Sequence, residues 1–182
     1  SRRLPDVRVL LTRRDDTFVE LENRSAMANA VAADLFLSIH LNAADEPVDH
    51  GGVTTFVLDT TDDRQAARLA ARENGTTVGE VGSLARLLAS LHRADQVGAS
   101  RSFAEQLHTA TLAAGRRYLP TLHDRHVRSA LFHVLVGARM PAVLLAASFL
   151  SRREEAEALR TTQYRQALAE GIAEGIVRWA GG

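Results

Sequence analysis

The chain has 182 residues, 46% of them apolar, and its 22 basic side chains balance 22 acidic ones. This composition is typical of one globular domain with a substantial core, and not of a disordered chain. Zero net charge excludes the basic surface of a nucleic-acid-binding protein. The absence of cysteine excludes disulfides and cysteine-ligated metal sites. No apolar run approaches the roughly 20 residues that span a bilayer, so we expect no membrane insertion.

Segments with strand character alternate with segments with helix character along the chain. Runs of β-branched and apolar residues predict strands at residues 7–12, 34–39, 53–58, 142–148 and within 127–136. Apolar spacing and capping residues, such as Thr17 with Glu20, predict helices at residues 18–33, 62–74, 83–92, 100–119, 151–160 and 161–179. The alternation predicts a single α/β domain with a mixed, mostly parallel sheet flanked by helices.

The second of these strands is followed directly by His40 and Asn42. A short apolar run between polar residues predicts a buried strand, and ligand-binding groups gather at the carboxyl ends of strands in open α/β sheets. His40 is therefore either a metal ligand or a polar residue at the point where the strand reaches the surface. Asn42 either orients a substrate or satisfies the hydrogen bonds of its own turn.

The other histidines give weaker signals. His123 and His126 are three residues apart, which could place both on one helix face, but Asp124 and the preceding proline favour a turn. His108 has no partner in the nearby sequence and is interpreted as a surface residue, whereas His133 falls inside a predicted strand. The charged residues 152–155 are interpreted as the solvated start of a helix, although Arg152 could also meet a substrate carboxylate.

Several short motifs follow one another along nearly the whole chain: Leu11-Thr12-Arg13, Ala28-Asn29, Ser38-Ile39-His40 with Asn42, Pro141-Ala142-Val143-Leu144-Leu145 and Ser148-Phe149-Leu150-Ser151. In this order and spacing they resemble the zinc-dependent N-acetylmuramoyl-L-alanine amidases of bacterial cell-wall turnover and cell division. The resemblance implies a hydrolase that cleaves the amide between N-acetylmuramic acid and L-alanine of the stem peptide. In such an enzyme, zinc lowers the pKa of a bound water to about 7.

The resemblance also implies a zinc cleft at the carboxyl ends of strands. The family's metal ligands are a histidine in a Gly-His-Gly-Gly-like turn, a glutamate, and the histidine that corresponds to His40. Only His40 is found in this chain. We therefore expect that residues 1–182 form an amidase catalytic domain that lacks its N-terminal strand and helix.

Ala146 stands where the family has its general-base glutamate. Alanine cannot accept a proton, and loss of a general base typically costs about 10²- to 10⁴-fold in rate. The resemblance therefore implies an amidase inactivated at Ala146, by an engineered substitution or by natural loss. The alternative is a noncatalytic pseudoamidase domain that binds peptidoglycan.

The resemblance further implies the protein's partners and location. We expect peptidoglycan as the substrate, an activator protein as a further partner, and a periplasmic or secreted place in the bacterial cell envelope, as for an autolysin. The regulated division enzymes of the family carry an extra helix that blocks the zinc cleft. The span between Asn74 and Ser102 is short, so we expect no long autoinhibitory helix there.

Overall fold

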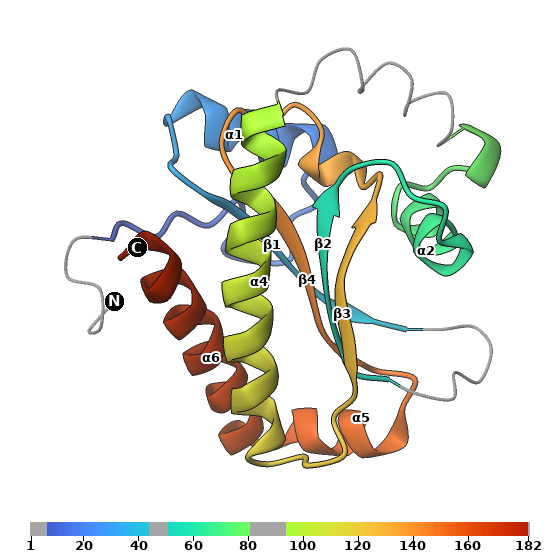
Figure 1. Ribbon diagram of the computed structural model, residues 1–182, viewed down its shortest axis with the longest axis vertical. Helices are drawn as coiled ribbons and strands as arrows, with labels where there is room; N and C mark the ends of the chain where they lie inside the picture. The colour runs from blue at the N-terminus through green and yellow to red at the C-terminus, as the bar shows by residue number, and fades with distance from the viewer. Residues whose placement is uncertain (1–6, 44–50, 81–93, 182) are drawn as a thin grey trace. The chain divides into compact units, whose positions relative to one another are not determined.

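A computed structural model describes residues 7–43, 51–80 and 94–181 (Figure 1). The fold is an α/β domain with a four-stranded sheet. Contacts between Cα atoms divide the chain into two compact units. Unit 1 comprises Ser1–Phe36, Leu58–Val97 and Ser129–Ala142, and unit 2 comprises Leu37–Val57, Gly98–Arg128 and Val143–Gly182.

The sheet has the strand order β1-β4-β2-β3. The strands are β1 (Phe36–Asn42), β2 (Val53–Leu58), β3 (Asp124–Ala130) and β4 (Ala142–Phe149). β2 and β4 are antiparallel, and Thr54 lies opposite Ala146. Hydrogen bonds join the first and last residues of β1 to the corresponding ends of β4, and the start of β2 to the start of β3, so these two pairs are parallel. The predicted mixed, mostly parallel sheet is confirmed, and every residue of β2 and β4 is buried.

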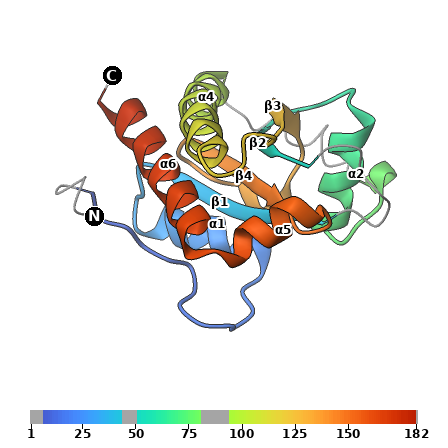
Figure 2. The same ribbon diagram turned by 90° about the horizontal axis from the view of Figure 1, so that it is seen from below.

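Unit 2 contains α5 (Arg153–Arg160), α6 (Thr162–Ala180) and most of α4 (Ala94–Arg116). Figures 1 and 2 show α4 and α6 side by side. Two glycines four residues apart on α6 allow this approach. A Cβ atom on Gly175 would lie 2.6 Å from the Cα of Leu107, and one on Gly171 would lie 2.7 Å from the Cβ of Ala114. The helices therefore pack with almost no side chain between their backbones at these points.

Unit 1 contains α1 (Leu21–Ala30), α2 (Arg64–Glu73) and the 3-10 turn η1 (His133–Leu135). Asn29 at the end of α1 donates to the Gly137 carbonyl over 2.8 Å and accepts from the Arg139 amide over 3.0 Å. Asn74, which follows α2, donates to the Leu131 carbonyl over 2.7 Å. Two asparagine side chains thus fasten α1 and α2 to the segment around η1.

The predicted strand at residues 7–12 and the start of the predicted helix at 18–33 are wrong. Residues 7–20 form neither strand nor helix, and α1 begins at Leu21. Val9 is 68% exposed. Thr17 does not cap a helix. Its backbone amide donates to the Asp15 carboxylate over 3.0 Å. A strand needs a neighbour for its backbone groups, and no described strand pairs with this segment.

Other boundaries also differ from those predicted. β1 includes His40 and Asn42 rather than ending before them. The predicted strand at 127–136 is divided into β3 and η1, so His133 belongs to a 3-10 turn. α4 begins six residues early, at Ala94 instead of residue 100. The helix predicted at 83–92 and part of the span expected to lack an autoinhibitory helix lie outside the described residues.

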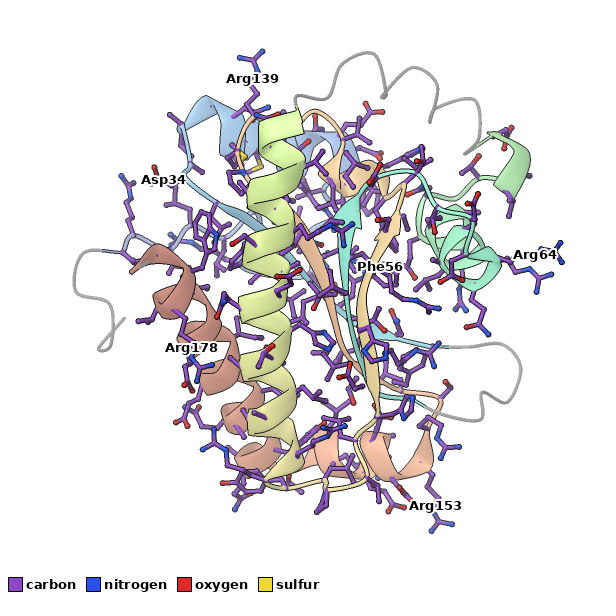
Figure 3. All side chains as sticks on the ribbon, in the orientation of Figure 1. Asp34, Phe56, Arg64, Arg139, Arg153 and Arg178 are labelled. Carbon is purple, nitrogen blue, oxygen red and sulfur yellow. The ribbon has the colours of Figure 1, made fainter. Side chains whose placement is uncertain are left out.

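The core of unit 2 lies between the sheet and its helices. Phe56 on β2 is 1% exposed, while Arg153 and Arg178 extend from α5 and α6 to the surface (Figure 3). Within the described parts of the chain, no helix is long and apolar enough to cross a membrane.

Candidate functional site

His40 and Ala146 lie on neighbouring parallel strands. The Phe36 amide donates to the Pro141 carbonyl over 3.0 Å at one end of the β1–β4 pair, and the Leu150 amide donates to the Asn42 carbonyl over 2.6 Å at the other. His40 therefore lies beside the stretch of β4 that contains Ala146. His40 is half-buried, whereas Ala146 is fully buried. The structure thus brings together the two positions that the sequence motifs singled out.

Asn42 carries an unpaired donor at the end of β1. Its residue is 3% exposed, and its side-chain Nδ2 has no hydrogen-bond partner among the described residues. An unpaired buried donor costs about 1–3 kcal/mol, and nearly all buried polar groups in proteins are paired. Most of the turn that follows Asn42 lies outside the described residues, so the alternative that this side chain satisfies its own turn stays a prediction.

Glu155 fixes the carboxyl end of β4, a role that the sequence did not reveal. Its carboxylate accepts the Gly52 amide over 2.8 Å, and the Ser148 hydroxyl and Phe149 amide over 2.7 Å each. The prediction that residues 152–155 form a solvated helix start is therefore wrong for Glu155, which is buried. A glutamate three residues into a helix that directly follows a strand was the available signal.

Arg152 lies beside a polar cavity of about 250 Å³ at this end of the sheet. The cavity is lined by Gly51, Leu119, Thr121, His123, Arg152, Glu154 and Glu155. All of these residues belong to unit 2, as do His40, Asn42 and Ala146. Arg152 and His40 therefore occur in the same compact unit, and Arg152 comes six residues after Ala146.

The described residues do not supply a complete metal site. No group of three or more His, Asp, Glu or Cys side chains among them could hold a metal ion. A catalytic zinc needs three protein ligands, so His40 alone does not fit one. Glu80 is an acidic residue after α2 that could be considered as a further ligand. Its carboxylate accepts hydrogen bonds from Thr76 and Thr77 instead, and these hydrogen bonds lower the pKa of Glu80 to about 2.

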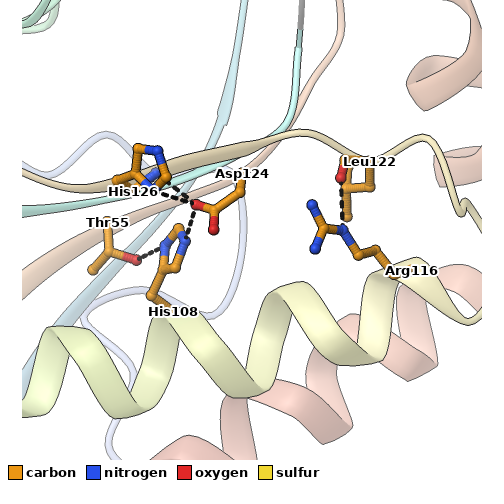
Figure 4. Close-up of polar contacts among 6 residues, drawn as sticks. All are labelled: Thr55, His108, Arg116, Leu122, Asp124 and His126. Carbon is orange, nitrogen blue, oxygen red and sulfur yellow. Dashed lines mark hydrogen bonds and ion pairs between the residues drawn. The ribbon is translucent and has the colours of Figure 1, made fainter.

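A second polar cluster lies on α4, β2 and β3 (Figure 4). Thr55 Oγ1 is 3.2 Å from His108 Nδ1, and His108 Nε2 is 2.8 Å from Asp124 Oδ1. The same oxygen accepts the His126 amide over 2.8 Å, and His126 Nδ1 lies 3.1 Å from it. His108 is 6% exposed, so its interpretation as a surface residue is wrong. Its partners Thr55 and Asp124 are 53 and 16 residues away in the chain, so no local pattern indicated the cluster.

The order hydroxyl, imidazole, carboxylate is that of a nucleophilic triad. However, Thr55 is fully buried, so no substrate reaches its hydroxyl. Burial lowers the pKa of His108, although Asp124 opposes this effect. Desolvation acts to raise the pKa of Asp124, but hydrogen bonds from His108 and His126 outweigh it and lower that pKa. The cluster therefore holds a neutral imidazole against a carboxylate, and it connects three elements.

Comparison with known proteins gives concordant results. Residues 2–178 match the model of the family described as N-acetylmuramoyl-L-alanine amidase. N-acetylmuramoyl-L-alanine amidase AmiA of Escherichia coli is 30% identical over 178 residues, and AmiA of Salmonella typhimurium is 31% identical over 178 residues. Each alignment covers 93% of this chain and 60% of the relative. The chain thus spans about three fifths of the length of these relatives.

Solved structures show the same fold. The catalytic domain of the amidase CwlV from Paenibacillus polymyxa superposes with a TM-score of 0.69 and 29% identity, covering 97% of this chain and 74% of that one. The CwlD amidase of Clostridioides difficile, solved in complex with the GerS lipoprotein, gives a TM-score of 0.62 and 21% identity over 94% of this chain and 75% of that one. The second likeness concerns the fold alone.

Proposed function

This chain belongs to the N-acetylmuramoyl-L-alanine amidase family, and on that premise we propose that it is a peptidoglycan amidase domain held inactive by the alanine at position 146. The observation that carries the proposal is the placement of His40 and Ala146 on adjacent parallel strands of the family's fold. The bond to be hydrolysed is the amide between N-acetylmuramic acid and L-alanine of the stem peptide.

The chemistry explains why one side chain decides the activity. Hydrolysis of an amide needs a group that takes a proton from the attacking water and passes it to the leaving nitrogen. The methyl group of Ala146 does neither. The fully buried β4 backbone and its pairing with Thr54 hold this position in place, so a carboxylate introduced there would project from a rigid strand.

Zinc is part of the proposal only through His40. When bound, zinc supplies an activated water and polarises the amide carbonyl. Since the described residues do not supply three ligands, we assign no step of the reaction to the metal. Metal analysis of the purified chain, joined to a segment with the family's other two metal ligands, tests the role of His40. One zinc per chain, lost in the His40→Ala variant, would support it, and equal zinc content in both would contradict it.

Two residues are proposed as substrate contacts. The unpaired Nδ2 of Asn42 suits a carbonyl oxygen of the stem peptide, because a bound acceptor would remove the cost of the buried donor. Arg152, beside the polar cavity, suits a peptide carboxylate, which guanidinium groups bind in a bidentate manner. The proposed setting is the bacterial cell envelope, periplasmic or secreted, with an activator protein as a further partner.

The test of the function is the release of stem peptides from purified sacculi by the Ala146→Glu variant of a chain to which a segment with the family's other two metal ligands has been joined ahead of residue 1. A noncatalytic peptidoglycan-binding domain is the second candidate, favoured by the alanine itself. It predicts that the chain sediments with sacculi and that Ala146→Glu releases no peptide. The amidase proposal predicts release by the variant.

A further inference from the structure

One hydrogen-bonded chain joins three elements of unit 2, and the proposed amidase reaction does not use it. Thr55 comes from β2, His108 from α4 and Asp124 from β3 (Figure 4). We propose that this chain is a proton-sensitive latch, which holds α4 on the sheet while His108 is neutral and loosens when His108 takes up a second ring proton. The latch rests on contacts within unit 2 alone and does not depend on the proposed function.

The hydrogen bonds fix which ring nitrogen carries the proton. A carboxylate only accepts hydrogen bonds, so the 2.8 Å contact with Asp124 requires a proton on His108 Nε2. In the neutral ring Nδ1 then has a lone pair, and it accepts the Thr55 hydroxyl proton over 3.2 Å. With the proton on Nε2, each donor in the chain from Thr55 to Asp124 faces an acceptor.

A second ring proton breaks this complementarity at Nδ1. The new N–H points at Thr55 Oγ1, whose own proton must then turn to another acceptor in a fully buried site. A positive charge also enters a place where the His108 side chain is 7% exposed. Burying an uncompensated polar group or charge is costly. Protonation therefore weakens the link to β2 first.

The charges around His108 act in both directions. Asp124 on β3 attracts the imidazolium, whereas Arg116 on α4 and His126 on β3 repel a positive charge. Thr55 on β2 is the neutral group that faces Nδ1. Burial is the largest effect, and the pKa of His108 stays below the ordinary histidine value. Neutral His108 is therefore the state that the fold favours.

The sign of the pH dependence follows. A histidine whose pKa is lower in the folded state than in the unfolded state stabilises the fold fully above the unfolded value of about 6.5. That contribution is lost as the pH falls from this value through the folded pKa. The loss of stability would affect the strand that bears Ala146, because Thr55 lies opposite Leu145 and the preceding residue, Thr54, lies opposite Ala146.

The test compares unfolding of the parent chain and its His108→Gln variant at pH 7.5 and pH 5.5. Glutamine can still donate to Asp124 but does not titrate, so the variant should lose less stability on acidification. The difference between the two chains corresponds to uptake of up to about one proton on unfolding. His133→Gln is the matched control: His133 lies in η1 of unit 1, outside this hydrogen-bonded chain, and its removal should leave the parent's acid sensitivity intact. Equal acid sensitivity in the parent and His108→Gln chains would overturn the latch.

A second measurement on the unmodified chain covers the case in which His108→Gln does not fold. Nitrogen NMR of the imidazole rings reports both the tautomer and the titration midpoint of His108. The latch predicts the Nε2–H tautomer at pH 7.5 and a midpoint below about 6.5. A midpoint at or above that value, or the Nδ1–H tautomer, would contradict it.

Discussion

Glu155 illustrates how a single buried carboxylate can hold a strand end. It accepts three hydrogen bonds, from Gly52, Ser148 and Phe149, and thereby joins α5 to β2 and β4. Gly51 has no room for a side chain beside it, since a Cβ there would lie 1.7 Å from a Glu155 carboxylate oxygen. The glycines before β2 and the glutamate on α5 therefore pack directly against each other, close to the carboxyl end of the strand that bears Ala146.

Glu155→Gln should destabilise the fold. The amide replaces one accepting oxygen by a donor that faces other donors, and hydrogen bonds to charged groups contribute roughly 1.5–3 kcal/mol each. We expect a loss of about 2–4 kcal/mol in the free energy of unfolding, measured by urea titration. Glu154→Gln serves as the control, because that side chain is exposed and makes only a 3.3 Å hydrogen bond with Thr121. Similar losses in both variants would refute the role of Glu155.

Single residues also show what the sequence could and could not reveal. The strands that bear His40 and Ala146 could be predicted because each contains a local motif, whereas the roles of these two residues stay predictions. The contacts of His108 and Glu155 could not be predicted, because their partners Thr55 and Gly52 are 53 and 103 residues away in the chain. Whether a polar residue is buried and paired depends on such distant contacts.

Among the secondary-structure elements, α4 and α6 approach each other closely because the glycines of α6 carry no side chain at the contact. Gly171 and Gly175 lie on one face of α6, and each approaches the backbone of α4. The buried residues of α6 include Leu168, Gly171 and Gly175, whereas Ile172 and Ile176 are only half-buried. A hydrophobic pattern alone does not show that the contact is made by glycine.

Gly175→Ala should therefore separate the two helices. The added methyl group would lie 2.6 Å from the Cα of Leu107, which is backbone and cannot turn aside. Overpacking of this kind costs about 1–3 kcal/mol, visible as a lower melting temperature. Gly98→Ala on α4 is the control: nothing lies within 4 Å of its added methyl, and alanine is favoured over glycine in helices by up to about 1 kcal/mol. A Gly175→Ala variant as stable as the Gly98→Ala variant would contradict this packing.

Elements that depend on local signals were predicted well, and those that depend on a neighbour were not. β2 has the predicted bounds, and α5 and α6 begin within two residues of theirs. The segment at residues 7–12 has the composition of a strand but no described partner. α4 starts before residue 100, where the helix was predicted to begin. Ser100 and Ser102 are of a type that favours helix starts, but serine also occurs inside helices when tertiary contacts stabilise them.

The chain as a whole combines membership of the amidase family with one altered position. The fold and the order of motifs agree with the amidase family, while Ala146 removes the proton acceptor that the resemblance implies. The described part of the chain brings His40 beside this position but does not complete a metal site around it. The central claim is therefore that the side chain at position 146 decides between activity and inactivity.

The deciding experiment compares the parent chain with Ala146→Glu on purified sacculi in the presence of zinc, both chains being joined to a segment with the family's other two metal ligands, and identifies released stem peptides by mass spectrometry. We expect the variant to release peptides with a free L-alanine amino terminus, and the parent to do so about 10²- to 10⁴-fold more slowly. Release at equal rates by both chains, or no release by Ala146→Glu, would contradict the central claim.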